Sequence, residues 1–584
     1  MNWLYPMVFL LMLLSAGCST IDQQSKVPFQ TKVHFKVKWP DSTNPPASLG
    51  LRGSINPLSW ERTFFLSGPD SAGFFTGSVQ LQINHPVQSL QWKLIANDTQ
   101  WELEGFTNRR EWLYADSSRV VNARYDNPDH PDSVKISAEG WQQDIRLLTR
   151  ALAEFHPSLY RFQDRDSYLS QVRMLENSRP VNQTEAYRLM TAFLSSIRCS
   201  HTWANRYNQA VSLNKYWLEE KQVLPFFTNW IEGSFIISDA IDTLAFPVGS
   251  RLMTIDSISA DSVASQLFPL TRADGTQHAK RMTQLCTGNN LQVTDLFLNL
   301  TDSSHVTILT PDSRVKRMDV SGTTFKQRQQ QLQRPADPWT LTFHQADRLA
   351  IMKLNSFTVW NFGFDWKKKL EQWFSRLAEK KTPHLIIDIR ENEGGADEVI
   401  SELTRYVIDQ TVTWKPGGIP VIRYETVPDS LRPFLSTWEP SWFDRRGTVK
   451  PTENGFYELT SRTGSPVVLE PANNRFNGTV WLLTSPINSS ATHHLAVLWN
   501  QFKLSIQVGT ETGGNLKGSS GGQFFFLHLP NSGLEVDIPL LTTLLAEPGP
   551  DTGLVPDLPA EQTIGDFLNH RDTAIERVLE EIRK

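Results

Sequence analysis

Cysteine is scarce in this sequence, with only Cys18, Cys199 and Cys286 among 584 residues. This count excludes a scaffold held together by disulfides. An excess of positive charge is also lacking, because the formal net charge is −5, and no nucleic-acid partner is expected. The apolar run at residues 3–14 is too short to span a membrane, although it is long enough for the apolar part of a signal peptide.

What the sequence does contain is typical of a soluble globular protein after this first segment. Hydrophobic residues make up 39% and charged residues 20% of the chain, as in ordinary folded domains. The length allows about four domains. Tryptophan is abundant, with 19 residues, and such a content favours a surface that binds a peptide or a glycan.

The start of the chain predicts export. The apolar run leads into Leu14-Ser-Ala-Gly-Cys18, which resembles the lipobox of bacterial lipoproteins. The resemblance implies that residues 1–18 end at a lipidated Cys18 and that residues 19–30 form a polar tether. The protein is then anchored through lipid in the bacterial cell envelope, at the outer membrane, on its periplasmic side or at the surface. An ordinary cleaved signal peptide is the alternative.

Residues 31–125 alternate apolar and polar side chains between glycines and prolines, a pattern that predicts a β-sandwich. The segments that matter are Gly53–Trp60, Leu90–Ile95, Asn97–Glu102 and Thr107–Arg109. Their order resembles the starch-binding type of carbohydrate-binding module, which makes a glucan a candidate ligand. The resemblance implies that Trp60 and Trp101 stack on sugar rings while Lys93 and Asn108 bind hydroxyl groups. Alternatively, both tryptophans belong to the core or dock the domain.

Residues 140–215 are predicted to be helical, because apolar residues recur on one stripe from Trp141 to Phe155. Ser200 and His201 follow the last of three expected helices. A lone histidine at such a place usually caps the helix or packs against it, which is the alternative to a functional role. Residues 216–335 read as a mixed module that resembles a peptide-binding PDZ module, ending in a polar linker at residues 324–338. Any small α+β insert has a similar pattern.

Residues 336–584 alternate strands and helices, which predicts an α/β core. The short apolar strand at residues 480–483 is followed by Asn488, Ser489 and Ser490, at a strand-to-helix junction where backbone N–H groups gather. Ser490 is the candidate nucleophile. The alternative is that Ser489 or Ser490 only caps the helix, since a Gly-x-Ser-x-Gly sequence is absent.

Several ordered motifs suggest one family. They are His156-Pro-Ser-Leu-Tyr160, Ser200-His201-Thr202, Asp388-Ile-Arg-Glu-Asn-Glu-Gly-Gly395, Val508-Gly-Thr-Glu-Thr-Gly-Gly514, Leu529-Pro-Asn-Ser532, Ile538-Pro-Leu540 and Gly553-Leu-Val-Pro-Asp557. Together they resemble the tail-specific, or C-terminal-processing, serine peptidases, over about residues 140–584. The fold class implied is a multidomain α/β protein with an N-terminal β-sandwich, a helical segment, a PDZ-like insert and a C-terminal α/β peptidase core.

The resemblance also assigns roles in cleaving a polypeptide substrate. Ser490 is the nucleophile, His201 is the general base and Ser200 supports it, as in the Ser/His branch of the family. Asp551 is the preferred orienting acid, with Glu547 as the other candidate. The oxyanion is held by backbone N–H groups of Gly394 or Gly395 and of Ala491.

Two departures from the family pattern leave a second reading open. His493-His494 stands where a glutamate is common, and Ala491 replaces a polar residue seen in some relatives. The lysine of the Ser/Lys branch is not matched, because Asn515 stands at its place and Lys517 is two positions away. A protein that binds peptides or glycans without cleaving is therefore the rival hypothesis. Neither a metal nor a cofactor is expected, because the adjacent histidines point about 100° apart on a helix.

Overall fold

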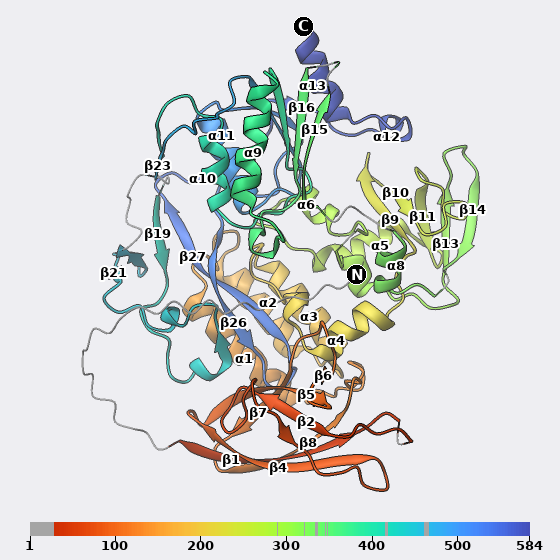
Figure 1. The fold of residues 1–584 in the computed structure, drawn as a ribbon, viewed down its shortest axis with the longest axis vertical. Coiled ribbons are helices and arrows are strands. Elements are labelled where there is room, and N and C mark those ends of the chain that lie inside the picture. Colours follow the sequence, from red (N-terminus) through yellow and green to blue (C-terminus); the bar gives the residue numbers. More distant parts are fainter. Residues whose placement is uncertain are drawn as a thin grey trace.

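The computed structural model describes residues 28–584 except 42, 289, 321, 333–336, 345, 347, 415–417 and 461–466. Cys18 and the expected tether up to residue 27 lie outside the described residues. Figure 1 shows the N-terminal domain at one end of the molecule, next to α1–α4, and the C-terminal core at the other end. The module with β9–β14 lies at the side of the core. The expectation of a multidomain mixed α/β protein is confirmed.

The N-terminal domain consists of two sheets around one core. Its strands are β1 (Phe29–Lys38), β2 (Leu49–Gly53), β3 (Phe64–Phe65), β4 (Phe74–Ile83), β5 (Val87–Ala96), β6 (Gln100–Trp101), β7 (Arg109–Tyr114) and β8 (Ser117–Arg124). One sheet has the order β4-β1-β8; the other has the order β3-β2-β5-β6, with β7 also paired to β5. Alternation on β1 buries Val33, Phe35 and Val37, as expected for a strand with one face on the core.

Helices follow the N-terminal domain, and side chains cap the three longest. They are α1 (Ala138–Phe155), α2 (Arg165–Asn177), α3 (Gln183–Ser196) and α4 (Val211–Lys215). Ser137, Asp164 and Asn182 each accept a hydrogen bond from a backbone N–H of the first turn of α1, α2 and α3. The stripe expected on α1 is buried, and Ser200 and His201 lie just beyond the end of α3.

The middle module is an antiparallel sheet with short helices. It contains β9 (Phe226–Ile231), β10 (Ser234–Ala240), β11 (Arg251–Ile255), β12 (Ile258–Ser259), α5 (Ala260–Leu267), α6 (His278–Thr283), α7 (Val293–Phe297), β13 (His305–Leu309), β14 (Val315–Asp319) and α8 (Phe325–Gln331). Helix α8 occupies residues expected to be a linker. The reason is a capping box between Thr324 and Gln327 and a buried ion pair of 2.9 Å between Arg328 and Asp295. Similarity to a PDZ module stays a prediction.

The C-terminal core is built on a largely parallel sheet of order β15-β16-β17-β24-β25-β28. Its elements are β15 (Trp339–His344), β16 (Leu349–Leu354), α9 (Trp366–Glu379), β17 (His384–Asp388), α10 (Glu398–Arg405), β24 (Thr479–Thr484), α11 (Ala491–Gln501), β25 (Ile506–Gly509), β28 (Leu558–Pro559), α12 (Ile564–Leu568) and α13 (Thr573–Arg583). Strands β17 and β24 are parallel neighbours, with Asp388 opposite Leu483. The segments that follow them therefore leave the same edge of the sheet, where α/β proteins place their sites.

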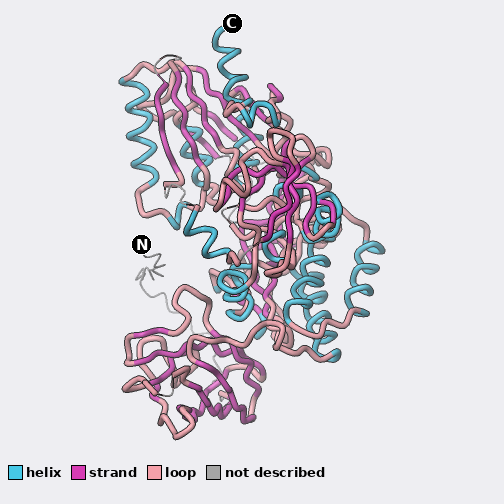
Figure 2. The backbone as a smooth tube through the Cα atoms, turned by 90° about the vertical axis from the view of Figure 1, so that its right-hand side faces the viewer, coloured by secondary structure: helices cyan, strands magenta, loops and turns pink. Residues whose placement is uncertain are grey.

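A second sheet, of order β20-β26-β27-β19-β22-β21, joins the core to the helices. Its strands, with the separate pair β18 and β23, are β18 (Val412–Trp414), β19 (Gly418–Ile422), β20 (Leu435–Ser436), β21 (Val449–Pro451), β22 (Tyr457–Leu459), β23 (Val467–Leu469), β26 (Ser520–His528) and β27 (Glu535–Leu545). The tube in Figure 2 shows the strand-rich N-terminal domain below this body. No helix in the described part of the chain has the length and apolar character to cross a membrane. Cys199 and Cys286 are both buried and unpaired.

Candidate active site

Ser490 lies at a sharp turn between β24 and α11. Its backbone has φ 50° and ψ −131°, in the left-handed region where a residue with a side chain is strained by about 1–3 kcal/mol. Such a turn projects a serine hydroxyl out of the sheet edge. The Ser490 side chain makes no capping hydrogen bond, and the Ser489 hydroxyl donates to the carbonyl of Glu393. Neither serine side chain thus caps α11.

The turn is held by buried amide groups from both segments at the sheet edge. The Asn488 side chain donates to the carbonyl oxygens of Ile389 and Asn392. The Asn392 side chain in turn donates to the carbonyl of Leu354 at 2.7 Å. Asn488 and Asn392 are both fully buried, so the position of Ser490 is fixed relative to the loop after β17.

Glycine is required at position 394, because this part of the loop lies against Ser490. Gly394 has φ +122°, and a Cβ there would be 2.9 Å from Cβ of Ser490 and 2.8 Å from the carbonyl oxygen of Ser489. Its N–H, however, donates to Oδ1 of Asn392 at 2.9 Å, so that donor is already used. Among the described residues, the N–H groups of Gly395 and Ala491 have no hydrogen-bond partner, and these two can hold an oxyanion.

His201 belongs to a chain of hydrogen bonds that begins at a carboxylate not expected from the sequence. Oγ of Ser200 donates to Oδ2 of Asp274 at 2.6 Å, and the Ser200 N–H donates to Oδ1 at 3.0 Å. Nδ1 of His201 lies 3.2 Å from the same Ser200 hydroxyl. Since the Ser200 proton points to Asp274, the Ser200 oxygen accepts from His201, and the proton of a neutral imidazole sits on Nδ1. Nε2 is then free to accept a proton.

The environment of His201 keeps its imidazole neutral. Burial lowers the pKa of His201 to about 4, against the raising effect of Asp274, and the positive charges of Arg272 and Lys280 lower it further. A neutral imidazole is the form that acts as a general base. Ser490 and His201 make no mutual hydrogen bond among the described residues, and catalytic hydrogen bonds often tighten only once substrate is bound.

Lys280 is a second group that the sequence analysis missed. Its ammonium is buried and donates to Oγ of Ser489. Burial lowers the pKa of Lys280 to about 8, although Glu393 has a raising effect. A lysine therefore does lie next to the turn, but it comes from α6 and not from the segment around Asn515 and Lys517.

The two candidate orienting acids lie away from His201. Oδ1 of Asp551 accepts from the side chain of Asn515 at 2.6 Å and from the N–H of Thr276 at 3.3 Å. The same Asn515 amide donates to the carbonyl of Asp274 at 3.1 Å. Asp551 thus braces the loop that carries Asp274, and it makes no hydrogen bond to His201 among the described residues. Glu547 is exposed.

The adjacent histidines on α11 have different environments. His493 is buried, and Nδ1 lies 2.8 Å from Oγ1 of Thr512; burial lowers the pKa of His493 to about 3. His494 lies nearer the surface, 3.9 Å from Asp397. The described residues include no group of three or more side chains placed to hold a metal. His493 is a packing residue.

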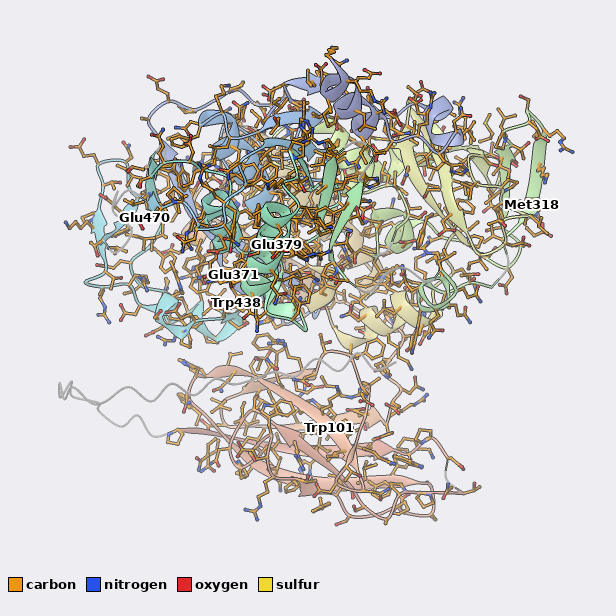
Figure 3. All side chains as sticks on the ribbon, turned by 45° about the horizontal axis from the view of Figure 1, so that its top comes forward. Trp101, Met318, Glu371, Glu379, Trp438 and Glu470 are labelled. Carbon is orange, nitrogen blue, oxygen red and sulfur yellow. The ribbon has the colours of Figure 1, made fainter. Side chains whose placement is uncertain are left out.

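A cavity of about 810 Å³ opens beside His201 and separates the main body from the N-terminal domain. Its walls include His201, Trp203, Trp438, Phe524 and Phe526 of the body and Asn108, Arg110, Trp112 and Arg119 of the N-terminal domain. Trp438 is 67% exposed and lies on the side of the body that faces this domain (Figure 3). A cleft of this size, lined by both aromatic and charged side chains, suits an extended peptide.

The N-terminal domain is docked by polar and aromatic contacts next to this cavity. Oγ1 of Thr107 donates to the carbonyl of Gln209 at 3.2 Å, and Arg110 lies 3.8 Å from Glu535. The rings of Trp112 and Phe434 are 5.3 Å apart. The domain therefore forms one wall of the cleft.

The four residues suggested for sugar binding are brought together only in part. Trp60 and Trp101 have ring centroids 6.5 Å apart, and Trp60 is 38% exposed. Lys93 donates to the carbonyl of Phe106 at 3.2 Å, and burial lowers its pKa. Asn108 donates to Gln91 at 3.3 Å and lines the cavity next to the main body.

Comparisons with known proteins identify the C-terminal core. Residues 348–558 match the family model described as Peptidase family S41, so this segment is similar to the peptidases of that family. It contains Gly395, Ser490 and Ala491, whereas His201 and Asp274 lie before it in the chain. No curated protein matches the sequence.

Two solved structures of mature CPAF have a fold similar to that of this chain. A structure of mature CPAF complexed with lactacystin is 12% identical, with a TM-score of 0.54, and the match covers 76% of this chain and 98% of that one. A second structure of mature CPAF is 12% identical, with a TM-score of 0.52 and coverage of 76% and 97%. A photosystem II D1 C-terminal processing protease is 13% identical, with a TM-score of 0.38 and coverage of 77% and 98%. The likeness to CPAF is one of fold.

Proposed function

We propose that the protein is a serine endopeptidase in which Ser490 attacks the scissile carbonyl and His201 is the general base. The observation that carries the proposal is the chain of hydrogen-bond contacts from Asp274 through Ser200 to His201. Asp274 orients Ser200, Ser200 fixes the proton of His201 on Nδ1, and Nε2 is left as an acceptor. This is the arrangement that a serine nucleophile needs.

The steps follow from this geometry. As Oγ of Ser490 bonds to the carbonyl carbon, its proton passes to Nε2 of His201. The carbonyl oxygen becomes an oxyanion that accepts from the N–H groups of Gly395 and Ala491. The imidazolium then gives its proton to the leaving amine as the C–N bond breaks, and an acyl ester remains on Ser490. Water hydrolyses this ester, with His201 again as the base.

The two N–H donors contribute much of the stabilisation. Each donor of an oxyanion hole is worth about 3–4 kcal/mol at the transition state. The geometry at Gly394 supports this role, because a Cβ there would lie 2.9 Å from Cβ of Ser490 and 3.2 Å from the nitrogen of Ala491, so both groups border the same space. The substrate is a polypeptide, held in the cleft between the body and the N-terminal domain.

A fluorophosphonate probe tests the proposal directly. The full chain is expected to be labelled covalently at Ser490, since an activated serine bonds to phosphorus, and Ser490→Ala should lose the label. Ser489→Ala is the matched control, and it should be labelled, even if more slowly. Absence of labelling in the parent protein would favour the rival function, a protein that binds peptides or glycans without cleaving them.

A second candidate function, glycan binding by the N-terminal domain, is favoured by the Trp60–Trp101 pair. Two flat rings, one of them 38% exposed, can stack on sugar rings. The full chain should therefore sediment with insoluble starch, with a dissociation constant of about 0.1–1 mM, and Trp101→Ala should remain in solution. If both proteins sediment equally, Trp60 and Trp101 serve for docking or packing and not for sugar binding.

Export and lipidation at Cys18 are part of the proposal. A Cys18→Ala variant is expected to accumulate as an unprocessed precursor when expressed in a bacterium, because the lipid-dependent cleavage needs the thiol. The apparent size and the membrane association of the parent and of Cys18→Ala measure whether the precursor is processed. Normal maturation of Cys18→Ala would instead indicate an ordinary signal peptide.

A further inference from the structure

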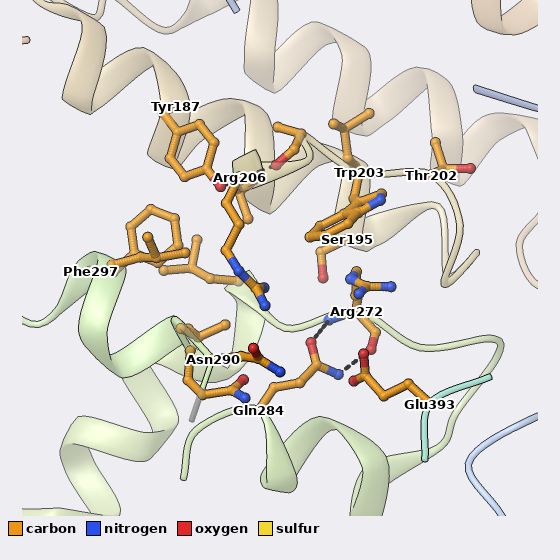
Figure 4. Close-up of a pocket in the computed structure, with 17 residues that line it drawn as sticks. Tyr187, Ser195, Thr202, Trp203, Arg206, Arg272, Gln284, Asn290, Phe297 and Glu393 are labelled. Atoms are coloured by element: carbon orange, nitrogen blue, oxygen red, sulfur yellow. Dashed lines mark hydrogen bonds between the residues drawn. The ribbon is translucent and has the colours of Figure 1, made fainter. Parts of the chain in front are cut away.

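A small cavity of about 50 Å³ lies beside the catalytic residues, between α3, α7 and the segment after His201. In Figure 4 the side chain of Arg206 extends into it between Phe297 and Trp203, and Arg272 and Glu393 lie on the side of Trp203. A cavity of this volume holds a few waters, which is the room that a carboxylate and one or two methylene groups need.

Both arginines at this cavity lack a carboxylate partner. Arg206 donates to the hydroxyl of Tyr207 at 2.8 Å, and its Nε is buried with no hydrogen-bond partner. Arg272 donates to the carbonyl of Ser200 and lies 3.9 Å above the ring of Trp203. Neither guanidinium forms an ion pair within 4.0 Å among the described residues. A buried donor without a partner is costly, so this arrangement is expected to be completed by a ligand.

The charges at the cavity favour an anion. Its lining includes two guanidinium groups, from Arg206 and Arg272, against one carboxylate, from Glu393. The Glu393 carboxylate also serves a third cation, because Lys280 and then Arg272 lower its pKa against the raising effect of burial. These three cations outnumber the single carboxylate, so positive charge is left over at the cavity. A guanidinium binds a carboxylate through two parallel hydrogen bonds.

The position of the cavity connects it to the reaction. Trp203 is two residues after His201, and Glu393 directly precedes Gly394 and Gly395, so two walls of the cavity belong to the segments that carry the proposed base and an oxyanion donor. We propose that it is a subsite that takes the carboxylate of an aspartate or glutamate side chain of the polypeptide substrate. The proposal rests on the proposed function, since it deepens the substrate class of the same site.

Binding by an inactive variant separates this proposal from catalysis. The protein is Ser490→Ala, and the probes are fluorescein-labelled alanine hexapeptides with Glu or Gln at each position in turn, ending in a carboxylate or an amide. We expect at least one acidic peptide to bind about ten- to hundred-fold more tightly than its neutral counterpart by fluorescence anisotropy, the range for a charged hydrogen bond. Preference for Glu in an amidated peptide supports the proposal, and a preference for the free terminus alone would overturn it.

The role of Arg206 is tested in the same background. Arg206→Gln should bring the ratio of the two affinities close to one, whereas Arg206→Lys, which keeps the charge, should retain part of the preference. Arg188→Gln is the matched control, because Arg188 is a neighbouring exposed arginine that does not line the cavity, and it should bind like the parent. Equal affinities for acidic and neutral peptides in Ser490→Ala, or a preference that survives in Arg206→Gln, would overturn the proposal. Failure of the proposed function would instead show as unlabelled Ser490 in the parent chain.

Discussion

Replacing His201 by alanine is expected to lower kcat about 10⁴–10⁶-fold, the range for loss of a base that acts as a unit with its serine. Nε2 is the only expected acceptor for the Ser490 proton, because Nδ1 is bound to Ser200. Hydrolysis of a quenched fluorescent peptide measures the loss. Lys517→Ala is the control and should keep activity close to that of the parent, since its ammonium lies 5.6 Å from the ring of Phe162, away from the turn.

The dependence of kcat/KM on pH distinguishes His201 from the nearby Lys280 as the base. Each group must be neutral to accept a proton. With the pKa of His201 at about 4, kcat/KM should stay level from neutral pH down to about pH 5 and fall as pH drops through 4. An unperturbed histidine would give a fall near pH 6.5. If Lys280 were the base, kcat/KM would fall below about pH 8, where its pKa lies, and Lys280→Ala would lose more than His201→Ala. Tryptophan fluorescence checks that the fold is intact at each pH.

The sequence indicated candidate site residues at places where regular elements end. An apolar strand that turns into a helix indicated Ser490, whereas the resemblance to the tail-specific peptidases indicated the glycines after β17 and Ser200 with His201 after a helix. The roles of these residues stay predictions, although each of them follows an element with a clear period. The parallel pairing of β17 with β24 then brings the first two together at one edge.

The residues that were missed come from irregular segments of the middle module. Asp274 lies in a turn before α6, and Lys280 lies on a helix of only six residues, so neither has a periodic pattern to mark it. Both reach the site through packing across more than 70 positions of sequence. Asp551 was the closer match to the family order, yet in the structure it contacts the Asp274 loop and not His201. Residues 324–338 were expected to be a linker because they are polar, whereas the structure has helix α8 there. The buried ion pair of Arg328 with Asp295 that holds this helix leaves no pattern in the sequence.

Asp274→Asn should lower kcat by about 10³–10⁴-fold, which corresponds to about 4–5.5 kcal/mol. An asparagine amide can turn its NH₂ toward Ser200, whose proton then points to Nδ1 of His201 and moves the imidazole proton to Nε2, the wrong tautomer for a base. Removing the carboxylate also removes the charge that raises the pKa of His201, so the acid limb of kcat/KM should shift to lower pH, an effect that a merely structural loss would not produce. Asp551→Asn is the matched control; it keeps its place beside Asn515 without touching Ser200, and its loss should be far smaller. Should Asp551→Asn prove the more damaging of the two, with the pH profile of Asp274→Asn unchanged, the orienting acid would be Asp551 and the hydrogen bonds to Ser200 would serve only to hold the loop.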